Sequence, residues 1–173
     1  KVAPSKLLAG ISKKLFQLLI STTSEVETTE TSQAASGWMA IILAIMPSFD
    51  DDMAVLLFKT IRPLLSGDCA GHVQKRSYLV LTELLEKHER AIHAHEPRTL
   101  VTQLISESLL SCHVSARHMR LRCMTLLFEP MAPQELQKAS EALVGEILLC
   151  LKDSNQKCRT NAIESLRLII RRC

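Results

Sequence analysis

The sequence predicts an all-α fold built from stacked antiparallel helix pairs. Its composition is the first reason: only 3% of the 173 residues are aromatic, while the apolar 47% is dominated by Leu, Ile and Ala. Leu and Ala favour helices, whereas strands are enriched in aromatic and β-branched residues. A second reason is that five Gly and six Pro are too few for a β protein with many tight turns.

The third reason is a pattern that occurs three times, beginning at Val73, Met119 and Cys158, with spacings of 46 and 39 residues. In each copy a small residue stands four positions after the start and a Leu four positions further on. These pairs are Ser77 and Leu81, Cys123 and Leu127, and Ala162 and Leu166. The small residue lets two helices approach, and the Leu fills their shared core. The spacings are close to the roughly 40–47-residue period of HEAT and armadillo repeats, which predicts an α-solenoid of that type.

The first helix of this solenoid is expected over residues 1–20, where six apolar residues recur at helical spacing. They are Leu7, Leu8, Ile11, Leu15, Leu18 and Leu19. Residues 21–36 contain nine Ser or Thr and three Glu, with Val26 as the one aliphatic residue larger than Ala. Burial of so little apolar surface does not offset the conformational entropy that the chain would lose on becoming ordered. A flexible loop is therefore predicted. Two interpretations of the loop stay open, a solvated insert or a phosphorylated linker.

Residues 37–173 are expected to form the stacked HEAT-type repeats and to be a fragment of a longer protein. The apolar run Trp38–Met46 predicts a short helix that is buried on several faces and ends at Pro47. The ranges of the later helices follow from apolar periodicity. They are Met53–Leu65, Val73–Glu86, Arg98–Leu110, Ser115–Phe128, Gln134–Leu151 and Asn155–Arg172.

Three consecutive acids, Asp50, Asp51 and Asp52, precede the expected helix Met53–Leu65. They could form a metal site, but no further ligands lie at a helical offset, so an N-cap followed by first-turn acids is the preferred interpretation. Pro63 is expected to kink this helix and Gly67 to end it.

Histidines are concentrated in the polar connector that precedes Pro97. His88, His93 and His95 lie there, and Cys112 and His113 follow further along the chain. These side chains could be assembled into a zinc site. Their spacing matches no compact zinc module, so we interpret the histidines as surface residues.

Charge, cysteine content and motifs limit the possible functions. A net charge of +3 permits an acidic partner without requiring one. The six cysteines form no Cys-x-x-Cys pair, no signal peptide opens the chain and the longest apolar run has nine residues, which indicates a soluble intracellular domain. No phosphate-binding Gly-rich loop, nucleophile elbow or His-Glu-x-x-His motif occurs, so we expect no catalytic residues, cofactor or metal. The expected function therefore belongs to the surface of the solenoid.

The second helices of the expected pairs share basic residues near their starts. These candidate RNA-binding residues are Lys75, Arg76, Arg117, Arg120, Arg122, Lys157 and Arg159. Stacking would align them as a basic ladder that contacts RNA phosphates or an acidic protein. Alternatively, they are solvated or paired with acids of adjacent turns. With so few aromatic residues for base stacking, RNA contact would read the backbone and shape.

Part of the chain resembles a known family. The run IRPLLSG at 61–67, followed by VQKRSYLVLTEL at 73–84, is similar to the HEAT-repeat family of ribosomal RNA-processing protein 12. The segments IILAIMP at 41–47, EILLCLKD at 146–153 and RTNA at 159–162 fit the same region. The resemblance covers roughly residues 37–172. The Ser/Thr-rich segment and the histidine-bearing connector are departures from it.

The resemblance implies a non-enzymatic scaffold of small ribosomal subunit biogenesis. Such a protein resides in the nucleolus and nucleus, with possible shuttling to the cytoplasm. It binds pre-rRNA and assembly factors within a large ribonucleoprotein and supports pre-rRNA maturation and nuclear export, with nuclear transport factors as further partners. The alternative is an importin-like transport adaptor that binds proteins or nucleoporin segments independently of RNA. A phosphatase or kinase scaffold is also compatible, because a fold alone does not specify a function.

Overall fold

The computed structural model describes residues 4–24, 28–66, 68–107 and 112–173, and these ranges are helical with no strand. The α-helices in chain order are α1 (Pro4–Ser24), α2 (Thr29–Ile45), α3 (Asp51–Ile61), α4 (Gly71–Lys87), α5 (Glu89–His95), α6 (Arg98–Glu107), α7 (Arg117–Phe128), α8 (Pro133–Glu141), α9 (Val144–Cys150) and α10 (Gln156–Arg172). Two 3-10 turns, η1 (Met46–Ser48) and η2 (Arg62–Leu65), extend α2 and α3. The all-α prediction is confirmed.

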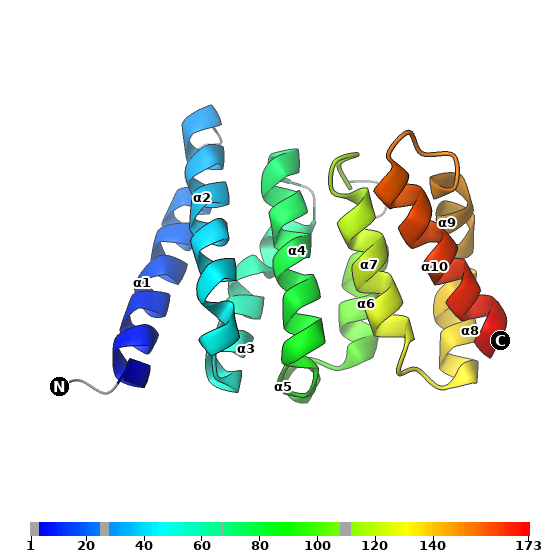
Figure 1. The fold of residues 1–173 in the computed structure, drawn as a ribbon, viewed down its shortest axis with the longest axis horizontal. Coiled ribbons are helices and arrows are strands. Elements are labelled where there is room, and N and C mark those ends of the chain that lie inside the picture. Colours follow the sequence, from blue (N-terminus) through cyan, green and yellow to red (C-terminus); the bar gives the residue numbers. More distant parts are fainter. Residues whose placement is uncertain (1–3, 25–27, 67, 108–111) are drawn as a thin grey trace.

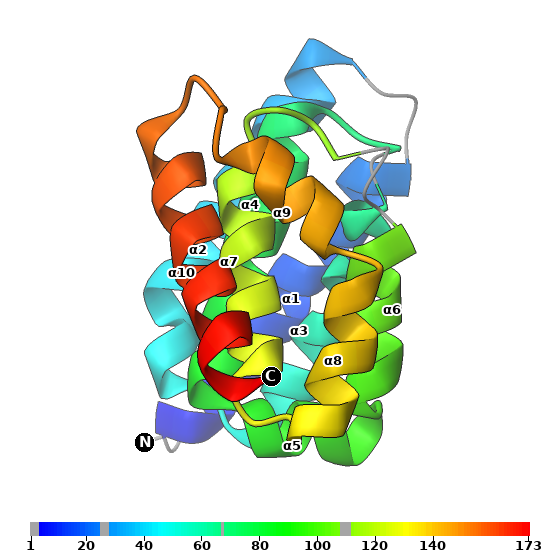
Figure 2. The same cartoon turned by 90° about the vertical axis from the view of Figure 1, so that its right-hand side faces the viewer.

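The helices form two layers. In one layer α2, α4, α7 and α10 lie side by side and run in the same direction (Figure 1). We call it the inner layer. The outer layer contains α1, α3, α6 and α8. Figure 2 shows the two layers edge-on, with α10 and α7 on one side and α8 and α6 on the other. This arrangement is compatible with an α-solenoid.

Small residues lie where inner-layer helices meet, as the repeated pattern predicts. Ser77, Cys123 and Ala162 are fully buried. The Ser77 hydroxyl of α4 lies 3.6 Å from the Met39 sulfur of α2, and the Cys123 thiol of α7 donates to the Tyr78 carbonyl of α4 at 3.3 Å. A larger side chain at either position would hold the neighbouring helix away. The pattern therefore identifies the contact face correctly.

The prediction of a flexible loop over 21–36 is wrong for the described residues. Residues 21–24 are the last turn of α1, and α2 begins at Thr29 with Thr28 as its N-cap. Hydroxyl groups that suggest a solvated segment instead bond to the helix itself: those of Thr22 and Thr23 donate to carbonyls four residues earlier at 2.6 and 2.9 Å. Composition does not reveal this pairing. Residues 25–27 lie outside the described ranges.

Two further boundaries differ from the predictions. Trp38–Met46 is not a separate helix but the second half of α2 and the start of η1, and its Ile41 is 45% exposed. The expected helix over Gln134–Leu151 is divided into α8 and α9 by a turn at Ala142 and Leu143. The histidine-bearing connector also contains a helix, α5.

The buried face of α1 is rotated relative to the predicted stripe. Ser12 is fully buried while Ile11 is 47% exposed, and Phe16 makes an edge-to-face contact with Phe49 at 5.9 Å between ring centres. Because α1 packs against both α2 and α3, its buried face follows these two neighbours. Periodicity alone does not show where they lie.

The three acids at the start of α3 act at its N-terminus as predicted. The Asp50 carboxylate accepts a hydrogen bond from the Met53 amide at 2.8 Å, and Asp51 and Asp52 occupy the first turn. The α-helix ends at Ile61, and η2 continues it in 3-10 geometry through Pro63, the position of the expected kink. Gly67, the expected stop, lies outside the described residues. None of the described helices combines the length and apolar character needed to cross a membrane.

Candidate nucleic-acid interface

The N-terminal ends of α4, α7 and α10 lie along one edge of the inner layer, at the top of Figure 1. Because these three helices are parallel, residues near the N-terminus of each lie at the same edge. Five of the seven predicted basic residues occupy this edge, which we call the basic edge. They are Lys75, Arg76, Arg117, Lys157 and Arg159. Each helix also directs the positive end of its dipole toward this edge.

Two lysines of the basic edge are uncompensated cations. Lys75 of α4 and Lys157 of α10 are exposed, and neither forms an ion pair with any residue that the structure describes. Both lie close to His118 of α7: burial lowers the pKa of His118, and the charges of Lys75 and then Lys157 lower it further. The structure thus gathers positive charge from two helices around a third.

The three arginines of the basic edge are partly engaged. The Arg76 Nε donates to the Ser36 hydroxyl of α2 at 2.7 Å. Arg117 lies 3.5 Å from the Asp153 carboxylate, with 42% of its side chain exposed. Arg159 donates to the carbonyls of Asp153 and Ser154 at 2.7 and 2.9 Å and so secures the turn between α9 and α10. A guanidinium has several N–H donors, so these contacts leave donors for a ligand.

Arg120 does not belong to the ladder, and its prediction as an RNA contact is wrong. Only 1% of the residue is exposed. Its Nε donates to the Ile105 carbonyl of α6 at 3.0 Å, and its Nη1 pairs with the Glu146 carboxylate of α9. The residue therefore joins α7 to the outer layer. Because α7 is buried on most of its circumference, its sequence shows no polar face that would identify the exposed arginine.

Arg122 is exposed but paired. Its Nη2 lies 2.9 Å from the Glu86 carboxylate of α4, and both side chains are slightly more than one-third exposed. Charge on the pair is therefore locally balanced. Arg122 fits the alternative interpretation of the ladder, in which basic residues pair with acids of a neighbouring helix.

Gln74 supports the edge and has no recognisable signal in the sequence. The residue is fully buried, although glutamine is usually exposed. Its side-chain amide donates to the Leu65 carbonyl at 3.2 Å and accepts from the His113 amide at 2.7 Å. These bonds connect the end of η2 to the segment that leads into α7, so the starts of α4 and α7 are held in register.

The remaining histidines and cysteines form no metal site within the described ranges, where no three His, Cys, Asp or Glu side chains come together. His88 pairs with Asp51 at 2.9 Å. His93 is half-buried, contrary to the prediction of a surface residue, and burial lowers its pKa. Burial also raises the pKa of Cys123 to about 12, so this thiol stays protonated and packs as a small apolar group.

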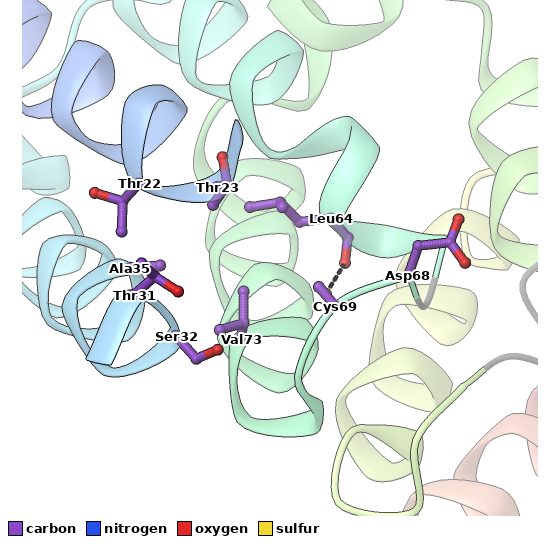
Figure 3. Close-up of a pocket in the computed structure, with 9 residues that line it drawn as sticks. All are labelled: Thr22, Thr23, Thr31, Ser32, Ala35, Leu64, Asp68, Cys69 and Val73. Carbon is purple, nitrogen blue, oxygen red and sulfur yellow. Dashed lines mark hydrogen bonds between the residues drawn. The ribbon is translucent and has the colours of Figure 1, made fainter. Parts of the chain in front are cut away.

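A cleft of about 290 Å³ lies between the end of α1, the start of α2 and the turn before α4 (Figure 3). Four of its nine lining residues carry hydroxyl groups. Those of Thr22 and Thr23 donate to their own helix, and the Cys69 thiol donates to the Leu64 carbonyl at 3.4 Å. Since these groups already have partners, the cleft provides no evident binding chemistry.

Comparison with known proteins adds no further assignment, because no family model and no curated protein matches the chain. The structure itself defines a two-layered helical protein with one positively charged edge.

Proposed function

We propose that this chain is a HEAT-type α-solenoid scaffold that binds RNA through its basic edge. Support for the repeat assignment comes from the parallel inner helices and from the small residues at their contacts, among them Ser77 and Cys123. In this proposal the pairs α1–α2, α3–α4, α6–α7 and α8/α9–α10 are successive repeats, with α5 as part of a connector.

The observation that carries the RNA proposal is the pair of uncompensated lysines, Lys75 and Lys157, on either side of His118. Adjacent packed helices are about 8–10 Å apart, so the edge from α4 to α10 spans on the order of 20 Å and contacts several phosphates. Lysine binds phosphate as a point charge, and the nearby helix N-termini add favourable backbone dipoles. The recognition is of the phosphate backbone, with little dependence on base sequence.

At the level of the cell, the resemblance of residues 37–172 supports a role in small ribosomal subunit biogenesis. The proposed partners are pre-rRNA and assembly factors, in the nucleolus and nucleus with shuttling to the cytoplasm. The scaffold supports pre-rRNA maturation and nuclear export and has no catalytic role. An importin-like adaptor is the competing class, and its partners would remain bound after RNA is removed.

The direct test measures binding of single-stranded RNA at several salt concentrations. The double variant Lys75→Glu/Lys157→Glu is compared with Lys13→Glu/Lys59→Glu, which makes the same charge change at exposed positions away from the edge. We expect the edge variant to bind weakly to all sequences and to show a salt dependence whose slope is smaller by about 1 per lysine. Equal binding by the two double variants would contradict the proposal.

The cellular role is tested separately by isolating the tagged protein from cells with and without nuclease and sequencing the bound RNA. Enrichment of small-subunit precursor rRNA, lost in Lys75→Glu/Lys157→Glu, is expected. Nuclease-resistant protein partners without that RNA would favour the transport adaptor.

A further inference from the structure

An exposed imidazole lies on the basic edge, in the segment that leads into α7. It belongs to His113, whose amide donates to the side chain of the buried Gln74 of α4 at 2.7 Å. Lys75 of α4 follows Gln74 directly, and Arg117 of α7 comes four residues after His113. The ring is therefore held at the junction of α4 and α7, with a cation on each of these helices. The proposed phosphate contact does not use it.

The ring of His113 lies face-on against Gly71, the first residue of α4. A Cβ added at Gly71 would stand 2.3 Å from both Cγ and Nδ1 of the imidazole and 2.6 Å from its Cε1. Nearly equal distances to three adjacent ring atoms place this position over the face of the ring and not at its edge. Any larger residue at 71 would displace the ring, so glycine is what allows the close approach.

Ser115 fixes the orientation of the same ring. Its amide donates to Nδ1 of His113 at 3.2 Å, and its hydroxyl lies 2.9 Å from Nδ1 and 3.1 Å from the Gly71 carbonyl. With Nδ1 as an acceptor, the neutral ring carries its proton on Nε2. The backbone amide, one ring nitrogen and one ring face of His113 are thus all engaged. Because the ring is already ordered, a ligand that contacts it pays little conformational entropy.

The surface that His113 leaves to solvent has the shape of a stacking platform. Gly71 covers one face and Ser115 occupies Nδ1, so the exposed surface is that of the opposite face and the Nε2 edge. Unpaired nucleobases stack on flat aromatic faces of this kind, histidine included. Stacking accepts every base, since each has a π face, which agrees with a contact that depends little on base sequence.

We infer that the His113 ring stacks against one unpaired nucleobase of the bound RNA. The inference rests on the proposed RNA contact and narrows its ligand to single strands, because the bases of a duplex are stacked on one another and offer no free face. The phosphates of the strand follow the cations of the basic edge, among them Lys75 and Arg117, while one base turns onto the ring at the α4–α7 junction.

The experiment compares two ligands with the same number of phosphates, an oligouridine and a ribose-phosphate oligomer of equal length that lacks bases. Wild-type protein should bind the oligouridine at least about 5-fold more tightly, the lower end of the effect of one stacked base. His113→Gln keeps a polar side chain without a π face and should bind the two oligomers equally. Gly71→Ala leaves the histidine in place but pushes its ring away, so it should lose most of the preference.

Both variants should retain the wild-type affinity for the base-free oligomer, which shows that their fold and cations are intact. His95→Gln changes an exposed histidine of α5, away from the basic edge, and is the matched control that should keep the preference. Lys75→Glu/Lys157→Glu should weaken binding of both oligomers by the same factor.

Two results would overturn the inference and leave the phosphate contact standing. One is equal binding of the two oligomers by wild-type protein, and the other is an undiminished preference in His113→Gln or Gly71→Ala. If wild-type protein binds neither oligomer, the RNA proposal itself is contradicted, and this inference fails with it.

Discussion

Arg120 of α7 forms a buried ion pair with Glu146 of α9 and also donates to the Ile105 carbonyl of α6, so it joins the inner layer to the helices behind it. Arg120 is 1% exposed and the Glu146 side chain 16%. Desolvating two charges is costly, so the pair adds little net stability by itself. Removing one partner is different, because it leaves the other charge buried without compensation.

Arg120→Met is therefore expected to lower the free energy of unfolding by about 3–5 kcal/mol. The double variant Arg120→Met/Glu146→Leu should recover a large part of this loss, since it leaves no unpaired charge. Urea denaturation measures both. Arg122→Ala is the control: its pair with Glu86 is exposed, and a change of about 0–1 kcal/mol is expected. A double variant as unstable as Arg120→Met would show that packing, and not charge, explains the loss.

The pKa of His118 reports on the basic edge. Because the charge of Lys75 lowers this pKa, Lys75→Gln should raise it, and Lys157→Gln should do so to a smaller extent. NMR titration of the histidine ring protons measures the change, with Lys13→Gln as a control for net charge. An unchanged pKa in both variants would mean that the lysines do not approach His118.

Stability is expected to fall in mildly acidic solution. Burial lowers the pKa values of His93 and His118, so below the ordinary histidine pKa of about 6.5 the unfolded chain binds protons that the folded chain does not. The stability that depends on neutral histidines is complete above this pH and is lost as the pH falls through the folded-state values. Urea denaturation between pH 7.5 and 5.5 should show a smaller decrease for His93→Asn/His118→Asn than for wild type. Parallel decreases would assign the effect to other groups.

The α7–α10 contact has no room for a larger side chain at Ala162, which is fully buried. Ala162→Leu is expected to destabilise the chain by about 1–3 kcal/mol through overpacking. Ile163 is the adjacent control, 41% exposed, where substitution by Ala should have a much smaller effect. Thermal and urea unfolding compare the two. A neutral Ala162→Leu would place α10 farther from α7 than the structure does.

The N-cap of α3 provides a local test. Asp50→Ala removes the acceptor of the Met53 amide and should cost about 1 kcal/mol. Asp52→Ala, an exposed change within the first turn, removes only a favourable charge near the helix dipole and should cost less. If the two variants lose equal stability in urea denaturation, capping is not the main contribution of Asp50.

Some features of this protein are determined locally and were therefore predictable. Ser77, Cys123 and Ala162 were expected at helix contacts because small residues and leucines at helical spacing define a packing face wherever the helix lies. The cap at Asp50 was predictable for the same reason, since it involves residues three positions apart. By contrast, the order of Thr22 and Ser32 was not predicted, because composition does not show that hydroxyls bond to their own helix or that Ser32 is buried against neighbours.

The sequence by itself determined that the chain is helical and which faces of α4 and α10 are apolar. It also determined that basic residues recur near the starts of the second helices. Only the tertiary structure decided the role of each basic residue. Arg117 and Arg120 are three positions apart on one side of α7, yet Arg117 is partly exposed and Arg120 pairs with Glu146, which lies 26 residues away in the sequence. Whether an arginine is buried or partly exposed, and which acid it pairs with, depends on which helix lies opposite, and that is a property of packing between distant segments.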